Sequence, residues 1–157
     1  MKKSLFLALI LFAITISCKD SNKKSEVISE DTKEEKLSII GVWERTSFYN
    51  YDSDGKVVDS FASTDGNRHI KTFSPSKVMW CRNIAADSTE WFGYGSYTLT
   101  DSLLTEVLEY GSVEMSKYIS QNPEFVFKYD LTNDKYSQIQ IDSEGHPLFA
   151  ENYIRIE

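Results

Sequence analysis

Short runs of alternating apolar and polar residues fill the chain from Leu37 onward. Successive side chains of a β-strand point to opposite faces of a sheet, so this period of two predicts strands. Turn-forming residues separate the runs, as at 52–55 and 144–147, where Asp, Gly and Pro favour tight corners. Nine strands are predicted in this way, at residues 42–50, 57–61, 69–73, 77–83, 91–100, 103–110, 124–131, 136–142 and 149–156.

One stretch, residues 113–121, breaks the alternation, and its spacing of Met115, Tyr118 and Ile119 allows a short helix or a lid. In the run 124–131, Phe125, Phe127, Tyr129 and Leu131 share one face, and this aromatic face is predicted to point inward. In the run 77–83, Val78, Trp80 and Arg82 share one face, and Lys77, Met79 and Cys81 share the other.

Eight or nine antiparallel strands rarely remain an open, flat sheet. Closure into an up-and-down barrel removes the exposed edges. A barrel of about eight strands has an interior just wide enough to be filled by side chains or to hold one small ligand. The sequence therefore predicts an all-β, antiparallel up-and-down barrel of about 8–9 strands over residues 37–157.

The N-terminal region has the pattern of a secretory leader. Lys2 and Lys3 precede an apolar run at residues 5–16, which is too short to cross a hydrocarbon core of about 30 Å as a helix. The run ends in Thr15-Ile16-Ser17-Cys18, which resembles the lipobox of bacterial lipoproteins. That resemblance implies a signal peptide at 1–17, cleavage before Cys18, acylation of Cys18 and attachment to membrane lipid. The alternative is a plain secretory leader followed by an incidental cysteine.

Residues 18–36 follow this cysteine and are rich in Lys, Asp and Glu, with no aromatic side chain. Such a segment cannot bury enough apolar surface to offset its ordering entropy, so it is predicted to be a flexible charged tether. Lys19-Asp20 resembles the short charged signal that directs some Bacteroidetes lipoproteins to the cell surface. We therefore expect a lipid-anchored protein of the cell envelope, at the outer membrane, facing the periplasm or the surface.

Composition narrows the function classes. Aromatic residues make up 13% of the chain, which favours an aromatic-rich β core. The net charge of −7 disfavours nucleic acid as a partner. If Cys18 is lipidated, Cys81 is the remaining thiol, so no internal disulfide is expected. Cys81 itself is expected to be a small buried apolar residue.

No catalytic or metal-binding pattern stands out. The two histidines, His69 and His146, have no cysteine or carboxylate at metal-ligand spacing. There is no glycine-rich phosphate loop and no nucleophile elbow. Glu106 and Glu109 fall on opposite faces of one strand and are expected to be solvated. We therefore expect no enzyme activity, no cofactor and no metal; an enzyme on this barrel would need a buried histidine or carboxylate at the pocket floor.

A family resemblance rests on both ends of the predicted barrel. Gly41-Val42-Trp43 is similar to the Gly-x-Trp signature that opens lipocalins, and Arg155 stands near the end of the last strand. In lipocalins such a guanidinium packs over the indole and plugs the closed end of the barrel. Residues 70–73, 94–97 and 104–110 resemble uncharacterised lipocalin-like domains of Bacteroidetes lipoproteins. The resemblance implies a lipocalin-like β-barrel with a small-molecule cavity, in a family without an agreed ligand.

These expectations combine into a membrane-anchored, lipocalin-like lipoprotein that binds a small hydrophobic or amphiphilic ligand in its barrel. Trp80 and Arg82 are the best candidates to orient an anionic or carbonyl group, with surface stacking of the cation as the alternative. The alternative function is an envelope scaffold or surface interaction lipoprotein whose barrel is filled by its own aromatics. A cavity of roughly 300 Å³ or more would favour the binding function. The six residues expected to line it are Trp80, Arg82, Tyr97, Phe127, Tyr129 and Tyr153.

Overall fold

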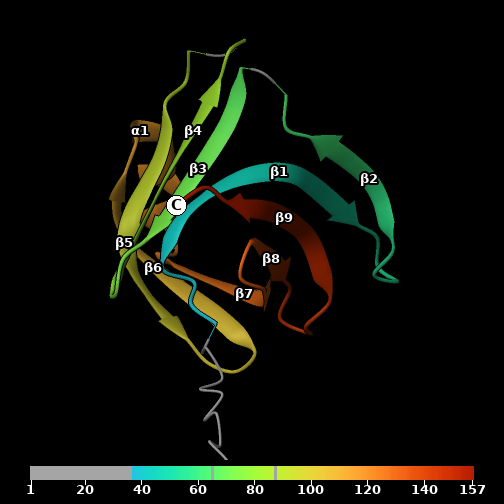
Figure 1. Ribbon diagram of the computed structural model, residues 1–157. Helices are drawn as coiled ribbons and strands as arrows, with labels where there is room; N and C mark the ends of the chain where they lie inside the picture. The colour runs from blue at the N-terminus through green and yellow to red at the C-terminus, as the bar shows by residue number, and fades with distance from the viewer. Residues whose placement is uncertain (1–36, 65, 87) are drawn as a thin grey trace, which may run out of the picture. The chain divides into compact units, whose positions relative to one another are not determined.

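The computed structural model describes residues 37–64, 66–86 and 88–157 (Figure 1). The predicted signal peptide 1–17, Cys18 and the tether 18–36 lie outside the described residues. The described chain forms these elements: β1 (Gly41–Tyr51), β2 (Val57–Ala62), β3 (Asn67–Phe73), β4 (Lys77–Ile84), β5 (Trp91–Leu99), β6 (Leu103–Gly111), α1 (Val113–Ile119), β7 (Glu124–Leu131), β8 (Lys135–Ile141) and β9 (Pro147–Arg155).

The strands agree with the alternation in the sequence. All nine are present, and each begins and ends within two residues of its expected position. At 113–121, where the sequence allowed a short helix or a lid, the structure has helix α1, whose N-cap is Ser112. The Ser112 hydroxyl accepts the backbone N–H of Met115 at 3.3 Å, which satisfies one of the unpaired donors of the first turn. Among the described residues, no helix is long and apolar enough to cross a membrane.

Strand β1 closes the barrel because it pairs on both of its edges. On one edge Trp43 is the partner of Lys71 in β3, and on the other it is the partner of Arg155 in β9. The closed wall therefore consists of eight antiparallel strands, β1 and β3 to β9. The C-terminus lies beside the start of β1 in Figure 1.

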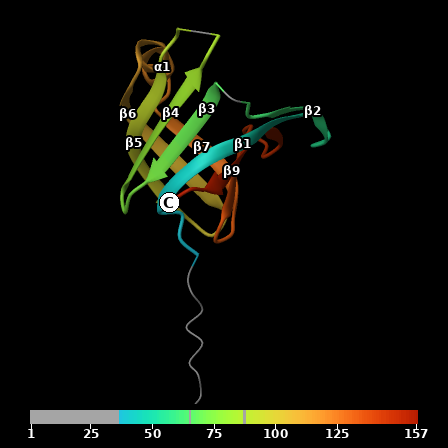
Figure 2. The same ribbon diagram turned by 45° about the horizontal axis from the view of Figure 1, so that its top comes forward.

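Strand β2 is an addition to this barrel. It pairs with the second half of β1, for example Phe61 with Phe48, while β3 pairs with the first half along the same edge. The two together act as one interrupted partner of β1. Figures 1 and 2 show β2 and the second half of β1 diverging from β3, while this half of β1 stays paired with β9; we call β2 the arm. The up-and-down order predicted from the sequence is thus kept, with one extra strand.

One end of the barrel is closed by the aromatic plug that the sequence predicts. The Trp43 side chain has no exposed surface, and its indole N–H donates to the Ile39 carbonyl at 2.8 Å. The guanidinium carbon of Arg155 lies 4.1 Å from the Trp43 ring centroid. Arg155 also donates to the carbonyls of Ser38, Ile40 and Asn133, so one side chain connects β9 with the segment before β1 and with the β7–β8 turn.

The expected burial of Cys81 is wrong: this thiol is exposed. Val78, Trp80 and Arg82 face the barrel interior. Because neighbouring residues of a strand point to opposite faces, Cys81 has to point outward.

Candidate functional site

The barrel encloses a cavity of about 570 Å³. It lies above the plug, toward the ends of the strands that carry Arg82 and Trp91 and toward helix α1, which contributes Met115. Its walls are largely apolar and include these six side chains: Phe48, Trp80, Trp91, Leu108, Phe125 and Phe127. The residues that separate this cavity from the plug are, in contrast, polar and charged.

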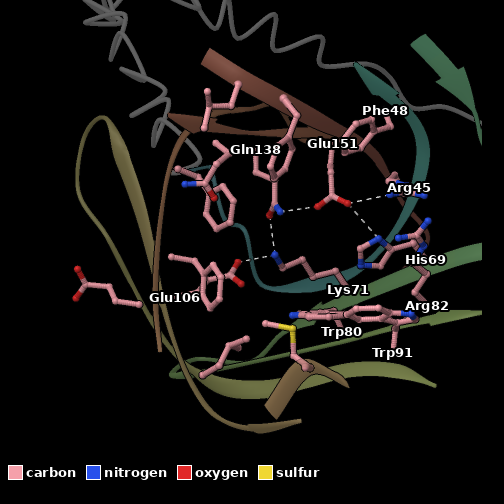
Figure 3. A pocket seen from close by; sticks show the side chains of 18 of the residues that line it. Arg45, Phe48, His69, Lys71, Trp80, Arg82, Trp91, Glu106, Gln138 and Glu151 are labelled. Carbon is pink, nitrogen blue, oxygen red and sulfur yellow. Dashed lines mark hydrogen bonds and ion pairs between the residues drawn. The ribbon is translucent and has the colours of Figure 1, made fainter. Parts of the chain in front are cut away.

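An ion pair crosses the interior at this level. The ammonium of Lys71 in β3 lies 2.5 Å from a carboxylate oxygen of Glu106 in β6, and both residues are 2% exposed. Strands β4 and β5 separate β3 from β6 in the wall, so the pair bridges the lumen rather than neighbouring strands. Lys71 also donates to the side-chain oxygen of Gln138 at 2.6 Å (Figure 3).

Glu151 of β9 is the centre of a second group of contacts. Its carboxylate accepts hydrogen bonds from Arg45 at 2.9 Å, Gln138 at 2.7 Å and the Tyr153 hydroxyl at 3.0 Å. The Nδ1 atom of His69 lies 3.3 Å from the same carboxylate. Gln138 therefore links Lys71 to Glu151, and the two groups form one continuous polar floor (Figure 3).

The electrostatics of this floor keep Glu151 ionised. Burial by itself would raise the pKa of Glu151, but the hydrogen bond and charge of His69, with the charges of Lys71 and Arg45, hold that pKa well below its usual range. Burial raises the pKa of Tyr153 well above its usual range, and the Glu151 charge raises it further. The floor therefore surrounds the buried carboxylate of Glu151 with hydrogen-bond donors.

This floor corrects the interpretation of Glu106 as a solvated strand charge. Glu106 lies on the same face of β6 as the buried Leu104 and Leu108, and its charge is matched by Lys71 from across the barrel. A carboxylate can be buried when it is paired in this way. The sequence alone shows the charge but not the partner.

Five floor residues were absent from the sequence-based candidates: Arg45, His69, Lys71, Gln138 and Glu151. A signal for them exists in the alternation. Each shares strand parity with a buried aromatic of the plug layer, as His69 and Lys71 do with Phe73, and as Glu151 does with Tyr153. Because polar residues are mostly exposed, alternation by hydrophobicity alone passes over them.

The structure brings three of the six candidate cavity residues together. Trp80, Arg82 and Phe127 line the cavity. Tyr97, Tyr129 and Tyr153 are not among its lining residues; they pack in or against the aromatic core around the plug. There the Tyr97 hydroxyl donates to the Ser74 carbonyl and that of Tyr129 to the Thr100 carbonyl. These tyrosines lie on inward faces but at the closed end of the barrel, in or against the aromatic core and below the cavity.

Gly93 in β5 sets the position of the Trp80 indole. A Cβ atom at Gly93 would lie 2.9 Å from the indole ring, so only glycine lets the ring rest against the β5 backbone. His69 meets the same indole edge-on, with ring centroids 5.5 Å apart. Trp80 therefore forms part of the cavity wall without occupying the lumen.

Some donors of the floor are not satisfied within the protein. The Nε atom of Arg45 and the Nε2 atom of His69 are buried and have no hydrogen-bond partner among the described residues. A buried polar atom without a partner is costly. In a cavity wall such an atom is open to water or to a bound molecule. Within the described residues, no group of three or more His, Cys, Asp or Glu side chains could hold a metal ion.

Comparison with known proteins supports the architecture. The chain is similar to the crystal structure of a lipocalin-like protein from Bacteroides uniformis, with a TM-score of 0.50 and 15% identity over 74% of this chain and 97% of that one. The barrel is lipocalin-like. The sequence-based resemblance is thereby confirmed at the level of the fold.

A second similar structure belongs to an uncharacterised protein from Bacteroides eggerthii, with a TM-score of 0.50 and 18% identity over 75% of this chain and 99% of that one. No protein-family model and no curated protein matches the chain. At these identities the likeness of the lipocalin-like barrel extends to the fold alone, so any function has to be argued from the cavity itself.

Proposed function

We propose that this lipocalin-like protein binds a small hydrophobic or amphiphilic molecule inside its barrel. The observation that carries the proposal is the cavity of about 570 Å³ with aromatic walls and a polar floor. A barrel of this size can be filled by its own side chains, but this one keeps a space within the range of small-molecule sites. Apolar walls supply affinity, while a few fixed polar groups orient the ligand.

The floor contains a buried histidine and two buried carboxylates, which are the groups that an enzyme on this barrel would need, but the contacts of the two carboxylates favour a binding role. Glu106 is paired with Lys71, and Glu151 accepts three hydrogen bonds. The partners of Glu151 hold its pKa low, so this carboxylate is a weak general base. We therefore propose neither an enzyme activity nor a cofactor for this protein.

One observation favours the second candidate function, a scaffold or surface interaction protein. Strand β2 stands at the edge of the sheet, and its Val58 and Phe61 side chains are 62% and 55% exposed. Exposed apolar residues on an edge strand are typical of sites that contact another chain. This function would use the arm and leave the cavity without a ligand.

The ligand test uses the chain from residue 18 onward, with Cys18→Ala to keep it unlipidated, purified from its own host. Native mass spectrometry is expected to show a copurifying small molecule. Leu108→Trp, which fills the cavity wall, should abolish this extra mass, whereas Leu99→Trp at an exposed position should retain it. An empty wild-type chain, or an extra mass that persists in Leu108→Trp, would favour the scaffold.

Attachment to the cell envelope through acylated Cys18 is part of the same proposal and is supported by the leader and lipobox-like residues. Several acyl chains would make the anchoring stable. In a bacterial host, the full-length chain should fractionate with membranes and carry the added acyl mass. Cys18→Ala should release it to the soluble fraction. A wild-type chain found soluble and without acyl mass would contradict the anchor.

A further inference from the structure

A lysine amine lies at the boundary between the polar floor and the apolar walls of the cavity. Among the described residues that line the cavity, Lys71 is the only lysine. Its Nζ atom lies 2.5 Å from Glu106 in β6 and 2.6 Å from Gln138 in β8 (Figure 3). The ring centroid of Phe127, which belongs to the apolar wall, is 5.6 Å from the same nitrogen. A ligand held by the walls therefore ends next to a primary amine.

A lysine amine forms an imine, a reversible covalent bond, with a carbonyl compound. In the net reaction, the ammonium of Lys71 and an aldehyde give a protonated imine and one water molecule. A carbon–oxygen double bond is replaced by a carbon–nitrogen double bond, and nothing is oxidised or reduced. The nitrogen carries one positive charge before and after the reaction. Imine formation therefore keeps the charge with which Glu106 is paired.

Glu106 is placed to carry the proton that this reaction has to move. The ammonium releases one proton before its nitrogen attacks the carbonyl carbon, and a carboxylate oxygen of Glu106 lies 2.5 Å away to accept it. The proton then returns to the hydroxyl group of the carbinolamine, which leaves as water. Lys71 and Glu106 are each 2% exposed, so bulk water has little access to hydrolyse the imine.

Gln138 tolerates the loss of its contact with Lys71. An ammonium has three N–H donors, whereas a protonated imine keeps one, which stays with Glu106. The side-chain oxygen of Gln138 then loses the donor at 2.6 Å. This oxygen also accepts the Tyr136 hydroxyl, and the amide nitrogen of Gln138 donates to Glu151 at 2.7 Å. Imine formation therefore leaves Gln138 hydrogen-bonded on both of its polar atoms.

The cavity walls determine which carbonyl compounds fit. The side chains above the amine are apolar and include Trp80, Leu108 and Phe127. An aldehyde with an unbranched hydrocarbon chain places its carbonyl at the floor and its chain against these walls. A polar aldehyde would instead bury its hydroxyl groups against hydrocarbon, which costs free energy when they find no partner. The cavity therefore favours apolar aldehydes.

We propose that Lys71 binds an apolar aldehyde covalently, as an imine that stays paired with Glu106. This assignment rests on the proposed binding function and specifies a ligand class for the same cavity. The captured aldehyde is released when water hydrolyses the imine. The assignment predicts that an alkanal is attached at Lys71, whereas the alcohol of the same length is held by the apolar walls alone.

The test treats the unlipidated Cys18→Ala chain from residue 18 onward with octanal and sodium cyanoborohydride at neutral pH. Cyanoborohydride reduces an imine to a stable secondary amine, so each lysine that formed an imine keeps an octyl group. Octanal is kept below the protein concentration, and peptide mapping by mass spectrometry identifies the labelled residues. Lys71 is expected to carry at least about tenfold more label than the partly exposed Lys77, because the cavity holds the aldehyde beside its amine.

Matched variants and a polar aldehyde serve as controls. Lys71→Arg keeps a cation opposite Glu106 but has no primary amine, so the label in this part of the chain should disappear. Glu106→Gln should slow the labelling of Lys71 at least about tenfold. Lys77→Arg and Glu109→Gln change a pair on the outer face of the barrel and should leave the label at Lys71 unaltered. Glyceraldehyde should label exposed lysines but not Lys71.

The outcomes separate the two proposals. Octanal label spread evenly over Lys71 and the exposed lysines would overturn the imine site, and so would equal labelling of Lys71 by octanal and glyceraldehyde. These comparisons use the unsubstituted Lys71 and Glu106, so they decide the question even if the variants at these positions fail to fold. Octanal and octanol that both bind in native mass spectrometry, without label at Lys71, would overturn the imine and leave the binding function intact. If neither binds and the native mass is also empty, the proposed function itself fails.

Discussion

The ion pair between Lys71 and Glu106 should stabilise the barrel only as a pair. Their charged atoms lie 2.5 Å apart inside the lumen, and both residues are 2% exposed. Glu106→Gln keeps the shape of the side chain but leaves the Lys71 ammonium buried with Gln138 as its acceptor. Removing one partner of a buried pair costs about 3–5 kcal/mol.

This loss in the free energy of unfolding can be converted into a change in the melting temperature, Tm. A folded domain of roughly 120 residues has an unfolding entropy of about 0.25 kcal/mol/K, so the loss corresponds to a fall of about 12–20 °C in Tm. Calorimetry gives Tm directly. Urea unfolding, followed by the fluorescence of the chain's three tryptophans, gives the free energy of unfolding.

A matched control lies on the same strand. Glu109→Gln makes the same change on the outer face of β6, where Glu109 pairs with the partly exposed Lys77. An exposed pair contributes less than about 1 kcal/mol. The double variant Lys71→Met/Glu106→Gln removes both buried charges, so it should be more stable than Glu106→Gln alone.

Two results would refute this reasoning. The first is a free energy of unfolding for Glu106→Gln within about 1 kcal/mol of the wild type, which is the level of an exposed pair. The second is strict additivity in the double-mutant cycle, because residues in direct contact should show a coupling energy.

Three further predictions concern other parts of the barrel. Because the pKa of Glu151 is lower in the folded than in the unfolded chain, the unfolded state takes up the proton first; stability should therefore decline as the pH falls below about 4.3, the unfolded value. In urea titrations against pH, Glu151→Gln should flatten this acid slope, and an unchanged slope would contradict the assignment. Gly93→Ala places a methyl group 2.9 Å from the Trp80 indole, so it should push the ring into the lumen and lower the free energy of unfolding by about 1–3 kcal/mol. It should also reduce the copurifying mass in native mass spectrometry, and unaltered stability and mass would mean that the ring can move elsewhere. Arg155→Lys keeps the cation but cannot make three separate carbonyl contacts in the fork geometry, so it should lower the free energy of unfolding by about 1–3 kcal/mol; a wild-type value would show that charge alone closes the barrel.

Local patterns in the sequence determined where the strands lie and how several of them face. The alternation of Phe125, Phe127 and Leu131 is enough to orient β7, and turn residues mark the strand ends. The Gly-x-Trp signature and Arg155 placed the plug, because the first and last strands of a closed meander must pair. These features depend on neighbours along the chain or on closure itself.

The polar floor depended on contacts that only the closed barrel creates. Lys71 and Glu106 come from strands that do not pair with each other, so alternation can place each of them on an inward face but cannot show that the two charges meet. The same holds for the cavity: whether inward side chains meet across the barrel or leave a space depends on the barrel diameter and on Gly93. Sequence alternation states which residues share a face, but burial of a charge is decided by the partner that folding brings across the barrel.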